Sequence, residues 1–197
     1  MLATRNKGKI AEFRKLFASM DINLLSLDDF PDLGEIEESG ANFEENALIK
    51  ARETALHTGH LAIADDSGLS VDALKGSPGV YSARYAGTNA SDDENMEKLL
   101  LELKGLSADK RKAAFNCVIA AAKPSGESIT VKGSCEGIIA ETAVGGGGFG
   151  YDPLFFLPEY NCTMAELSSG EKNKISHRAN AVKELKNVLP SFIRSLL

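Results

Sequence analysis

The chain has 197 residues, of which 43% are hydrophobic and 25% are charged, an ordinary balance for one globular domain with a buried core. Its formal net charge of −6 argues against a protein that wraps nucleic acid, because such a protein needs a basic face for the phosphates. No apolar run is long enough to cross a bilayer, so we expect no membrane partner.

The cysteines and histidines limit the redox setting and the metal chemistry. Cys117, Cys135 and Cys162 are widely spaced and include no Cys-x-x-Cys pair, so the sequence indicates neither a disulfide framework nor a zinc site. Reduced thiols and the lack of a signal-peptide pattern predict a cytoplasmic protein. The three histidines form no His-Glu-x-x-His motif, so any metal would be a hard ion with oxygen ligands, such as magnesium.

The first segment predicts a short strand, 1–4, followed by a helix with apolar residues at helical spacing. The turn between them presents free backbone N–H groups and the positive end of the helix dipole, and both favour an anion. This turn is a candidate phosphate cradle, although an asparagine cap followed by solvated lysines explains the same pattern. It consists of Thr4, Arg5, Asn6, Lys7, Gly8 and Lys9.

A second strand is predicted near 23–27, and an acidic segment, 34–40, follows it. This segment could be a solvated loop, or it could bring one carboxylate back toward a buried strand end. Asn42 is the expected N-cap of a helix that stops at Gly59. Lys50 borders the apolar stripe of this helix, so it either snorkels over the core edge or reaches into a binding site.

The stretch 61–69 organises our interpretation of the chain. Its first four residues are apolar and predict a short, fully buried strand, which then delivers Asp65, Asp66 and Ser67. Adjacent side chains of a strand point to opposite faces, so we expect the two aspartates to do different jobs. A carboxylate at a buried strand end needs an ion pair, hydrogen bonds or a metal, unless both aspartates simply cap a turn.

The middle of the chain predicts further regular structure. Ser91 and Glu94 form a capping box that opens a helix. Two long apolar segments, 113–122 and 128–139, predict a β-hairpin. Arg84, which precedes these elements, could serve a phosphate or pair with an acid.

A glycine-rich stretch, 145–153, runs directly into an apolar strand, 154–157. It satisfies G-x-G-x-x-G formally, but Pro153 and a strand follow where a dinucleotide fold needs a helix. The glycines permit close approach of the backbone to a ligand, so Phe149 is a candidate stacking platform for a planar base. A flexible linker is the alternative interpretation.

Ser176 is the expected N-cap of the C-terminal helix, which places His177 and Arg178 in its first turn. Positive charge at that position opposes the helix dipole. This local rule-breaking suggests an anionic or carbonyl-bearing partner.

Five motifs stand in order along nearly the whole chain, and together they resemble the inosine triphosphate pyrophosphatase family. The motifs are Thr4-x-Asn6-x-x-Lys9, Ala64-Asp-Asp-Ser-Gly-Leu69, Gly79-Val-Tyr-Ser-Ala-Arg84-Tyr85, Gly147-Gly-Phe-Gly-Tyr-Asp-Pro153 and Ile175-Ser-His-Arg178. The resemblance implies a single α/β domain over 1–197 that is two-lobed, with a long twisted mixed β-sheet, flanking helices and an active-site cleft between the lobes. It also implies a homodimer.

The same resemblance implies roles for individual residues. Asp66 would be the general base and would bind magnesium together with Glu38, although the adjacent Glu37 stays an alternative ligand. The turn from Thr4 to Lys9 would bind the triphosphate with help from Lys50, and Ser67 would contact the substrate. The base and nucleoside would be held by Phe149, Gly150, Tyr151, Asp152, Lys172, His177 and Arg178.

The reaction that the resemblance implies cleanses the nucleotide pool, because ITP, dITP and XTP are hydrolysed to the monophosphate and pyrophosphate with Mg²⁺ as cofactor. His177 or Arg178 can donate to the 6-oxo group of such a base, whereas the 6-amino group of adenine would leave the donor unsatisfied. One alternative is a Maf-like nucleotide pyrophosphatase with another base preference, which leaves the last two motifs unexplained. The other is a non-catalytic nucleotide-binding module, which would have no use for Glu38 and Asp66.

Overall fold

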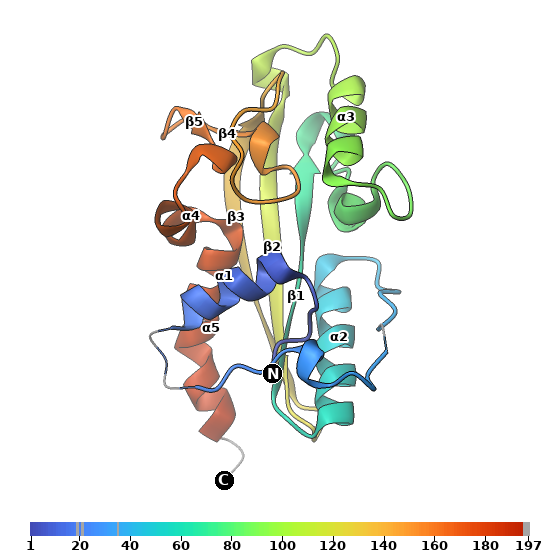
Figure 1. The fold of residues 1–197 in the computed structure, drawn as a ribbon, viewed down its shortest axis with the longest axis vertical. Coiled ribbons are helices and arrows are strands. Elements are labelled where there is room, and N and C mark those ends of the chain that lie inside the picture. The colour runs from blue at the N-terminus through green and yellow to red at the C-terminus, as the bar shows by residue number, and fades with distance from the viewer. Residues whose placement is uncertain (19, 21, 35, 195–197) are drawn as a thin grey trace. The chain divides into compact units, whose positions relative to one another are not determined.

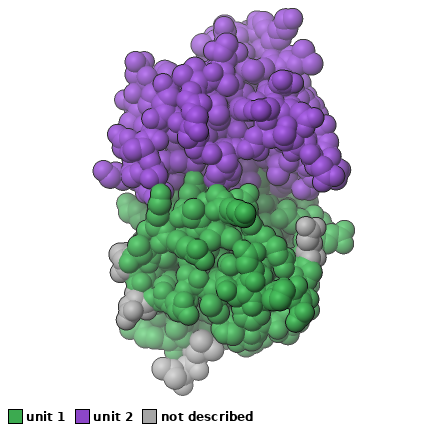
Figure 2. All heavy atoms as spheres, viewed as in Figure 1, with its two compact units in different colours: residues 1–66, 117–133, 178–197 green, residues 67–116, 134–177 purple. Residues whose placement is uncertain are grey.

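The computed structural model describes residues 1–18, 20, 22–34 and 36–194, and the chain divides into two compact units (Figure 2). Unit 1 contains residues 1–66, 117–133 and 178–197, and unit 2 contains residues 67–116 and 134–177. Each unit has a hydrophobic core of its own. That 1–197 is one domain stays a prediction. Among the described residues, no helix is both long enough and apolar enough to span a bilayer.

In the described part of the chain, five strands form one open sheet in the order β1-β2-β3-β4-β5, and helices flank it (Figure 1). The pairs β3–β4 and β4–β5 are antiparallel, whereas Leu2 makes isolated parallel bridges to Ser26 and Ile63. The predicted α/β class with flanking helices is therefore confirmed, whereas the five-stranded sheet is antiparallel and parallel pairing is limited to these isolated bridges. The strands are β1 (Ala62–Val71), β2 (Lys112–Ala122), β3 (Ser128–Ile139), β4 (Phe155–Leu157) and β5 (Cys162–Thr163). The helices are α1 (Lys7–Phe17), α2 (Phe43–Thr58), α3 (Asp92–Glu102), α4 (Ser169–Ile175) and α5 (His177–Arg194).

The two short strands expected at 1–4 and near 23–27 are wrong as strands, because each is reduced to an isolated bridge. The backbone N–H of Leu2 donates to the Leu25 carbonyl at 2.7 Å, and that of Ala3 donates to the Ile63 carbonyl at 2.8 Å. Asn6 already caps α1, so the extended run that precedes the helix is too short for a regular ladder.

Helix α2 lies beside β1 because its buried face is made of alanines (Figure 1). Ala47, Ala51 and Ala55 recur every fourth residue, so they share one face of the helix, and all are fully buried. Their small side chains pack with alanines of β1 and β2. This close packing carries the neighbouring polar residues of α2, Asn46 and Lys50, toward the strand.

From Cys117 onward, strand β2 is buried on both faces, and its two faces contribute to different clusters in unit 1. Val118, Ala120 and Ala122 pack with α2, whereas residues 117, 119 and 121 pack with α1 and α5. The alternation follows the two-residue period of a strand. The predicted hairpin is confirmed, since β2 and β3 are joined by a tight turn closed by backbone hydrogen bonds between Lys123, Gly126 and Glu127.

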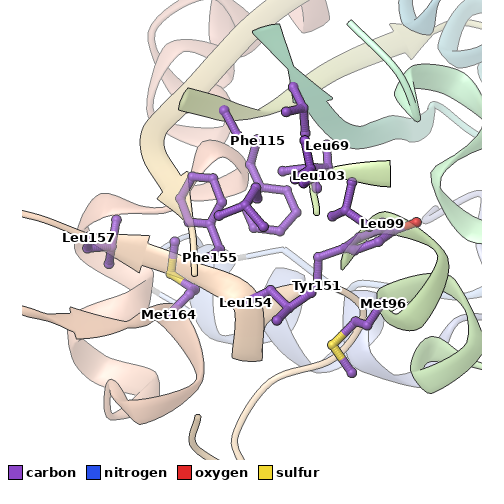
Figure 3. Close-up of a cluster of buried hydrophobic side chains, with 13 residues drawn as sticks. Leu69, Met96, Leu99, Leu103, Phe115, Tyr151, Leu154, Phe155, Leu157 and Met164 are labelled. Atoms are coloured by element: carbon purple, nitrogen blue, oxygen red, sulfur yellow. The ribbon is translucent and has the colours of Figure 1, made fainter. Parts of the chain in front are cut away.

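The core of unit 2 gathers leucines of α3 and aromatic residues of β2 and β4. Figure 3 shows Leu99 of α3 and its C-cap residue Leu103 together with Phe115, Phe155 and Tyr151. The rings of Phe115 and Phe155 lie 4.5 Å apart between centroids. The capping box predicted for the start of α3 is confirmed.

The C-terminal region contains one expected and one unexpected helix. Helix α5 begins at His177, directly after the extended residue Ser176, as predicted. The short helix α4 was not predicted, although Ser168 and Glu171 form a capping box, which is a sequence signal for the start of a helix.

Candidate functional site

The two neighbouring aspartates of β1 lie in unit 1 and have separate sets of partners. Asp65 is 3% exposed and Asp66 is 6% exposed. Asp65 contacts Lys9 and Arg178, whereas Asp66 contacts Asn46 and Lys50. The alternation of side chains along the strand predicted this separation.

Asp65 is held by two cations from different helices. Lys9 Nζ of α1 lies 3.0 Å from Asp65 Oδ2, and Arg178 of α5 donates to the same oxygen from Nη2 at 3.1 Å and from Nε at 3.3 Å. Arg178 also pairs with Glu12 through Nη1. Burial by itself would raise the pKa of Asp65, but the charges of Lys9 and Arg178 outweigh it and hold this pKa well below its usual range. Asp65 is therefore locked as an anion.

Asp66 shares a lysine with the acidic loop. Lys50 Nζ lies 2.7 Å from Glu38 Oε1 and 3.5 Å from Asp66 Oδ1, and the lysine is only 8% exposed. Burial raises the pKa of Asp66, and the charge of Glu38 adds to this, whereas Lys50 and the hydrogen bond from Asn46 act against it. The net direction is upward, opposite to that of Asp65. A raised pKa suits a carboxylate that has to accept a proton.

Glu38 and Asp66 fit a magnesium ion as a donor set. Their carboxylates converge on one cationic atom, and both are the hard oxygen ligands that Mg²⁺ prefers. Among the described residues no three acidic, histidine or cysteine side chains cluster as a metal site. Two carboxylates suffice for Mg²⁺, which usually keeps several waters and binds substrate phosphates.

The two candidate metal ligands in the acidic loop, Glu37 and Glu38, have different environments. Glu38 is half-buried against Lys50, whereas Glu37 is exposed. The geometry therefore favours Glu38. Glu35, in the same acidic segment, lies outside the described residues.

The turn from Thr4 to Lys9 is built as an N-terminal cap. Asn6 Oδ1 accepts a hydrogen bond from the Lys9 backbone N–H at 3.0 Å, and Thr4 Oγ1 accepts one from the Asn6 N–H at 3.1 Å. Arg5 donates to the Leu33 carbonyl at 2.6 Å. Lys7 and Gly8 occupy the first turn of α1. The asparagine cap is thus confirmed, but Lys9 is not a solvated lysine because it pairs with the buried Asp65. Phosphate binding by the same turn stays a prediction.

In unit 2, Asp152 organises the glycine-rich loop. Its buried Oδ2 accepts hydrogen bonds from the Phe149 backbone N–H at 3.0 Å and from Lys172 Nζ at 2.6 Å. Lys172 Nζ also lies 5.0 Å from the centroid of the Phe149 ring. The ring, the lysine and the aspartate that the sequence proposed for base binding therefore form one contact group.

At position 148 of this loop, packing requires glycine. A Cβ at Gly148 would lie 1.9 Å from Asp152 Oδ2, and the φ of Gly148 is +78°, in the left-handed region. The Gly150 N–H donates to Asp92 Oδ2 at 2.6 Å, and the Tyr151 hydroxyl donates to the Ser82 carbonyl at 2.9 Å. The loop is anchored at several points, so the linker interpretation is wrong.

The remaining predicted residues lie at the start of α5 and in β1. The His177 ring is buried and stacks on Phe115, with centroids 4.8 Å apart and an interplanar angle of 19°. The guanidinium of Arg178 is committed to Asp65 and Glu12, as described above. Ser67 follows Asp66 in β1 and is half-buried.

Sequence reasoning missed Asn46, which is fully buried and donates to Asp66 Oδ2 at 3.0 Å. A usable signal was present. Asn46 lies four residues before Lys50, so both occupy the same stripe of α2, next to its buried alanines. A polar residue at that position is unusual unless it has a partner.

Replacing Asp65 with asparagine would remove the anion that two buried cations share. We expect Asp65→Asn to lower the free energy of unfolding by about 3–5 kcal/mol at neutral pH, because breaking a buried pair leaves charges uncompensated. Asp66→Asn should cost clearly less, since within the described part of the chain Asp66 has one cationic contact and Asp65 has two. Urea unfolding of both variants measures the difference, and equal losses would contradict the structural role of Asp65.

The pH dependence of that loss has a definite sign. The native pKa of Asp65 is depressed, so its stabilisation is complete above the unfolded pKa of about 3.9 and is lost as the pH falls toward the native pKa. The stability gap between wild type and Asp65→Asn should therefore narrow below about pH 4. A gap that widened with acid would show that other groups dominate.

Comparison with known proteins places the chain in a family. A model of the Ham1 family matches residues 1–188. A dITP/XTP pyrophosphatase from Listeria monocytogenes serotype 4b is 53% identical over 100% of this chain and 97% of its own length. Solved structures of Ham1 proteins from Staphylococcus aureus and Coxiella burnetii match with TM-scores of 0.86 and 0.88, and each is 44% identical and covers 96% of this chain and 97% of its own. The family membership that the five motifs predicted is confirmed, and the chain belongs to the Ham1 family.

Proposed function

We propose that this chain hydrolyses the non-canonical purine nucleoside triphosphates ITP, dITP and XTP to the monophosphate and pyrophosphate, and so cleanses the nucleotide pool. The observation that carries the proposal is the convergence of Glu38 and Asp66 on Lys50 Nζ. It is supported by the full-length similarity to a dITP/XTP pyrophosphatase.

The chemistry assigns a distinct task to each residue of the Asp66 group. Asp66 orients the attacking water and takes its proton, which its raised pKa favours. When substrate binds, the ammonium group of Lys50 leaves the carboxylates of Glu38 and Asp66 and pairs with the triphosphate. A magnesium ion held by Glu38 and Asp66 would neutralise the phosphates and stabilise the departing pyrophosphate. The bond that breaks joins the α-phosphorus to the oxygen of the β-phosphate.

Different residues are assigned to the triphosphate and to the base of the substrate. The turn from Thr4 to Lys9, the start of α1, binds the triphosphate through backbone N–H groups and its cationic side chains. Ser67, which follows the proposed general base Asp66 in the chain, contacts the substrate.

The contacts to the purine are assigned to the residues that the resemblance implies for the base. Phe149 stacks on the ring, and Asp152 and Lys172 fix the orientation of Phe149 through the contacts that they make with it. Gly150 and Tyr151 support the same loop through Asp92 and Ser82. His177 and Arg178 supply the donors that a 6-oxo group accepts and a 6-amino group does not.

The two rival functions predict different products. A Maf-like pyrophosphatase would also release pyrophosphate but would prefer another base, and a binding module would release none. The paired carboxylates favour an enzyme, because binding an anion gains nothing from Glu38 and Asp66 without a metal. We also propose that the protein is cytoplasmic, where nucleotide pools are made and thiols stay reduced.

We further propose that the chain assembles as a homodimer, as the family resemblance implies. Light scattering after size-exclusion chromatography would give twice the mass of the chain at micromolar concentration. A monomer mass across that range would contradict this assembly without affecting the proposed reaction.

The adjacent glutamates offer a matched test of the metal site. With ITP and magnesium, we expect wild type to release IMP and pyrophosphate, and Asp66→Asn to lose activity by about 10²–10⁴-fold because it lacks the base. Glu38→Gln should require more magnesium for half-maximal rate, whereas Glu37→Gln should behave as wild type. If Glu37→Gln raised the magnesium requirement and Glu38→Gln did not, the ligand assignment would be wrong.

Base recognition can be tested through the ratio of kcat/KM for ITP to that for ATP. Phe149→Ala should weaken both substrates alike, by about 1–3 kcal/mol, because every base has a π-face. The double variant lacking His177 and Arg178 should lower the ratio. The ratio is the proper readout because Arg178 also stabilises Asp65, so its loss reduces the rate with both substrates. If the double variant kept the wild-type ratio of kcat/KM for ITP to that for ATP, the base would instead be recognised by backbone groups of the loop 145–150.

A further inference from the structure

Asn46 connects the acidic loop to the carboxylate of Asp66. It is the fourth residue of α2 and is fully buried. Its Oδ1 accepts a hydrogen bond from the Gly40 backbone N–H at 2.8 Å, and its Nδ2 donates to Asp66 Oδ2 at 3.0 Å. One side chain therefore touches both the segment that carries Glu38 and the proposed general base.

The orientation of this amide is fixed by its backbone partner. A backbone N–H can only donate, so the atom that faces Gly40 has to be the oxygen of the Asn46 amide. The NH₂ group is then turned toward Asp66 Oδ2, which accepts from it. The other oxygen, Asp66 Oδ1, lies on the side of Lys50. Asn46 thus fixes the rotation of the Asp66 carboxylate, with one oxygen on Asn46 and the other toward Lys50.

The loop is packed against α2 at the same point. A Cβ at Gly40 would lie 2.6 Å from Glu45 Cβ and 2.7 Å from Asn46 Oδ1, closer than real Cβ contacts. Only glycine lets the loop approach the helix so closely. Since Glu38 lies two residues earlier, the bond from Gly40 to Asn46 also limits where the Glu38 carboxylate can be.

We infer that Asn46 is a positioning residue of the active site, which sets the rotation of the Asp66 carboxylate and ties the Glu38 loop to it. The inference rests on the proposed pyrophosphatase function. Asn46 acts through Asp66 and Glu38 and does not touch the substrate. Partners of this kind typically change metal affinity or activity by about 10–100-fold when they are removed.

The chain contains a matched control for Asn46. Asn95 is the fourth residue of α3 and is 2% exposed. Its Oδ1 accepts from the Ala86 backbone N–H at 2.8 Å, as Asn46 does from Gly40, but its Nδ2 donates to the Ala83 carbonyl at 3.3 Å. The two asparagines therefore differ chiefly in whether the amide NH₂ reaches a carboxylate of the proposed site.

The experiment compares alanine and aspartate substitutions at both asparagines. The stability of each variant is measured by urea unfolding, and its kcat and KM are measured with ITP and magnesium. For the alanine variants, Mn²⁺ binding is also measured by calorimetry without nucleotide. We expect Asn46→Ala to lower kcat about 10–100-fold with the KM for ITP within about threefold of wild type, and to weaken Mn²⁺ binding. Asn95→Ala should lose comparable stability but keep kcat, KM and Mn²⁺ binding within about threefold.

The aspartate variants separate positioning from folding. Asn46→Asp keeps an acceptor for the Gly40 N–H but replaces the donor to Asp66 with a like charge, so we expect its kcat to fall at least as far as that of Asn46→Ala. It also reports on the site if Asn46→Ala does not fold. The inference is overturned if the folded Asn46 variants keep kcat within about threefold of their Asn95 counterparts. Failure of wild type to hydrolyse ITP would overturn the proposed function instead.

Discussion

Two carboxylates buried side by side in one strand are the constraint on which the arrangement of unit 1 depends. A buried carboxylate without partners is costly, and Asp65 and Asp66 are both almost fully removed from solvent. Strand geometry sends them to opposite faces, so each needs hydrogen-bonding partners of its own. The segments that supply those partners are α1 and α5 for Asp65, and α2 for Asp66, where Lys50 also holds the acidic loop.

On the two faces of β1, the partners of the buried carboxylates differ, so the adjacent residues Asp65 and Asp66 are suited to different tasks. Two cations outweigh the effect of burial at Asp65 and keep its pKa low, which suits a permanent structural anion. At Asp66, burial and the nearby Glu38 outweigh Lys50 and the neutral amide of Asn46, so the pKa is raised. Environments that push the pKa values of two carboxylates apart are a recognised basis for dividing their roles.

The glycine-rich loop of unit 2 illustrates how composition by itself can mislead. A run of glycines permits flexibility, yet here the small residues allow Asp152 to approach the backbone of the loop and to hold Phe149 and Lys172 in one group. The sequence proposed Phe149 for base binding, and the family resemblance added Asp152 and Lys172. It could not show that the aspartate fixes the other two, because that follows from the path of the loop.

What the sequence determined by itself was local. Caps at Asn42 and Ser91, the hairpin of β2 and β3, and the opposite faces of Asp65 and Asp66 depend on residues within a few positions, where propensity and periodicity decide. Tertiary structure alone decided the partners. Arg178 reaches Asp65 across 113 residues and Asn46 reaches Asp66 across 20, because the packing of α5 and α2 on the sheet, which no local pattern encodes, brings those side chains to the buried carboxylates.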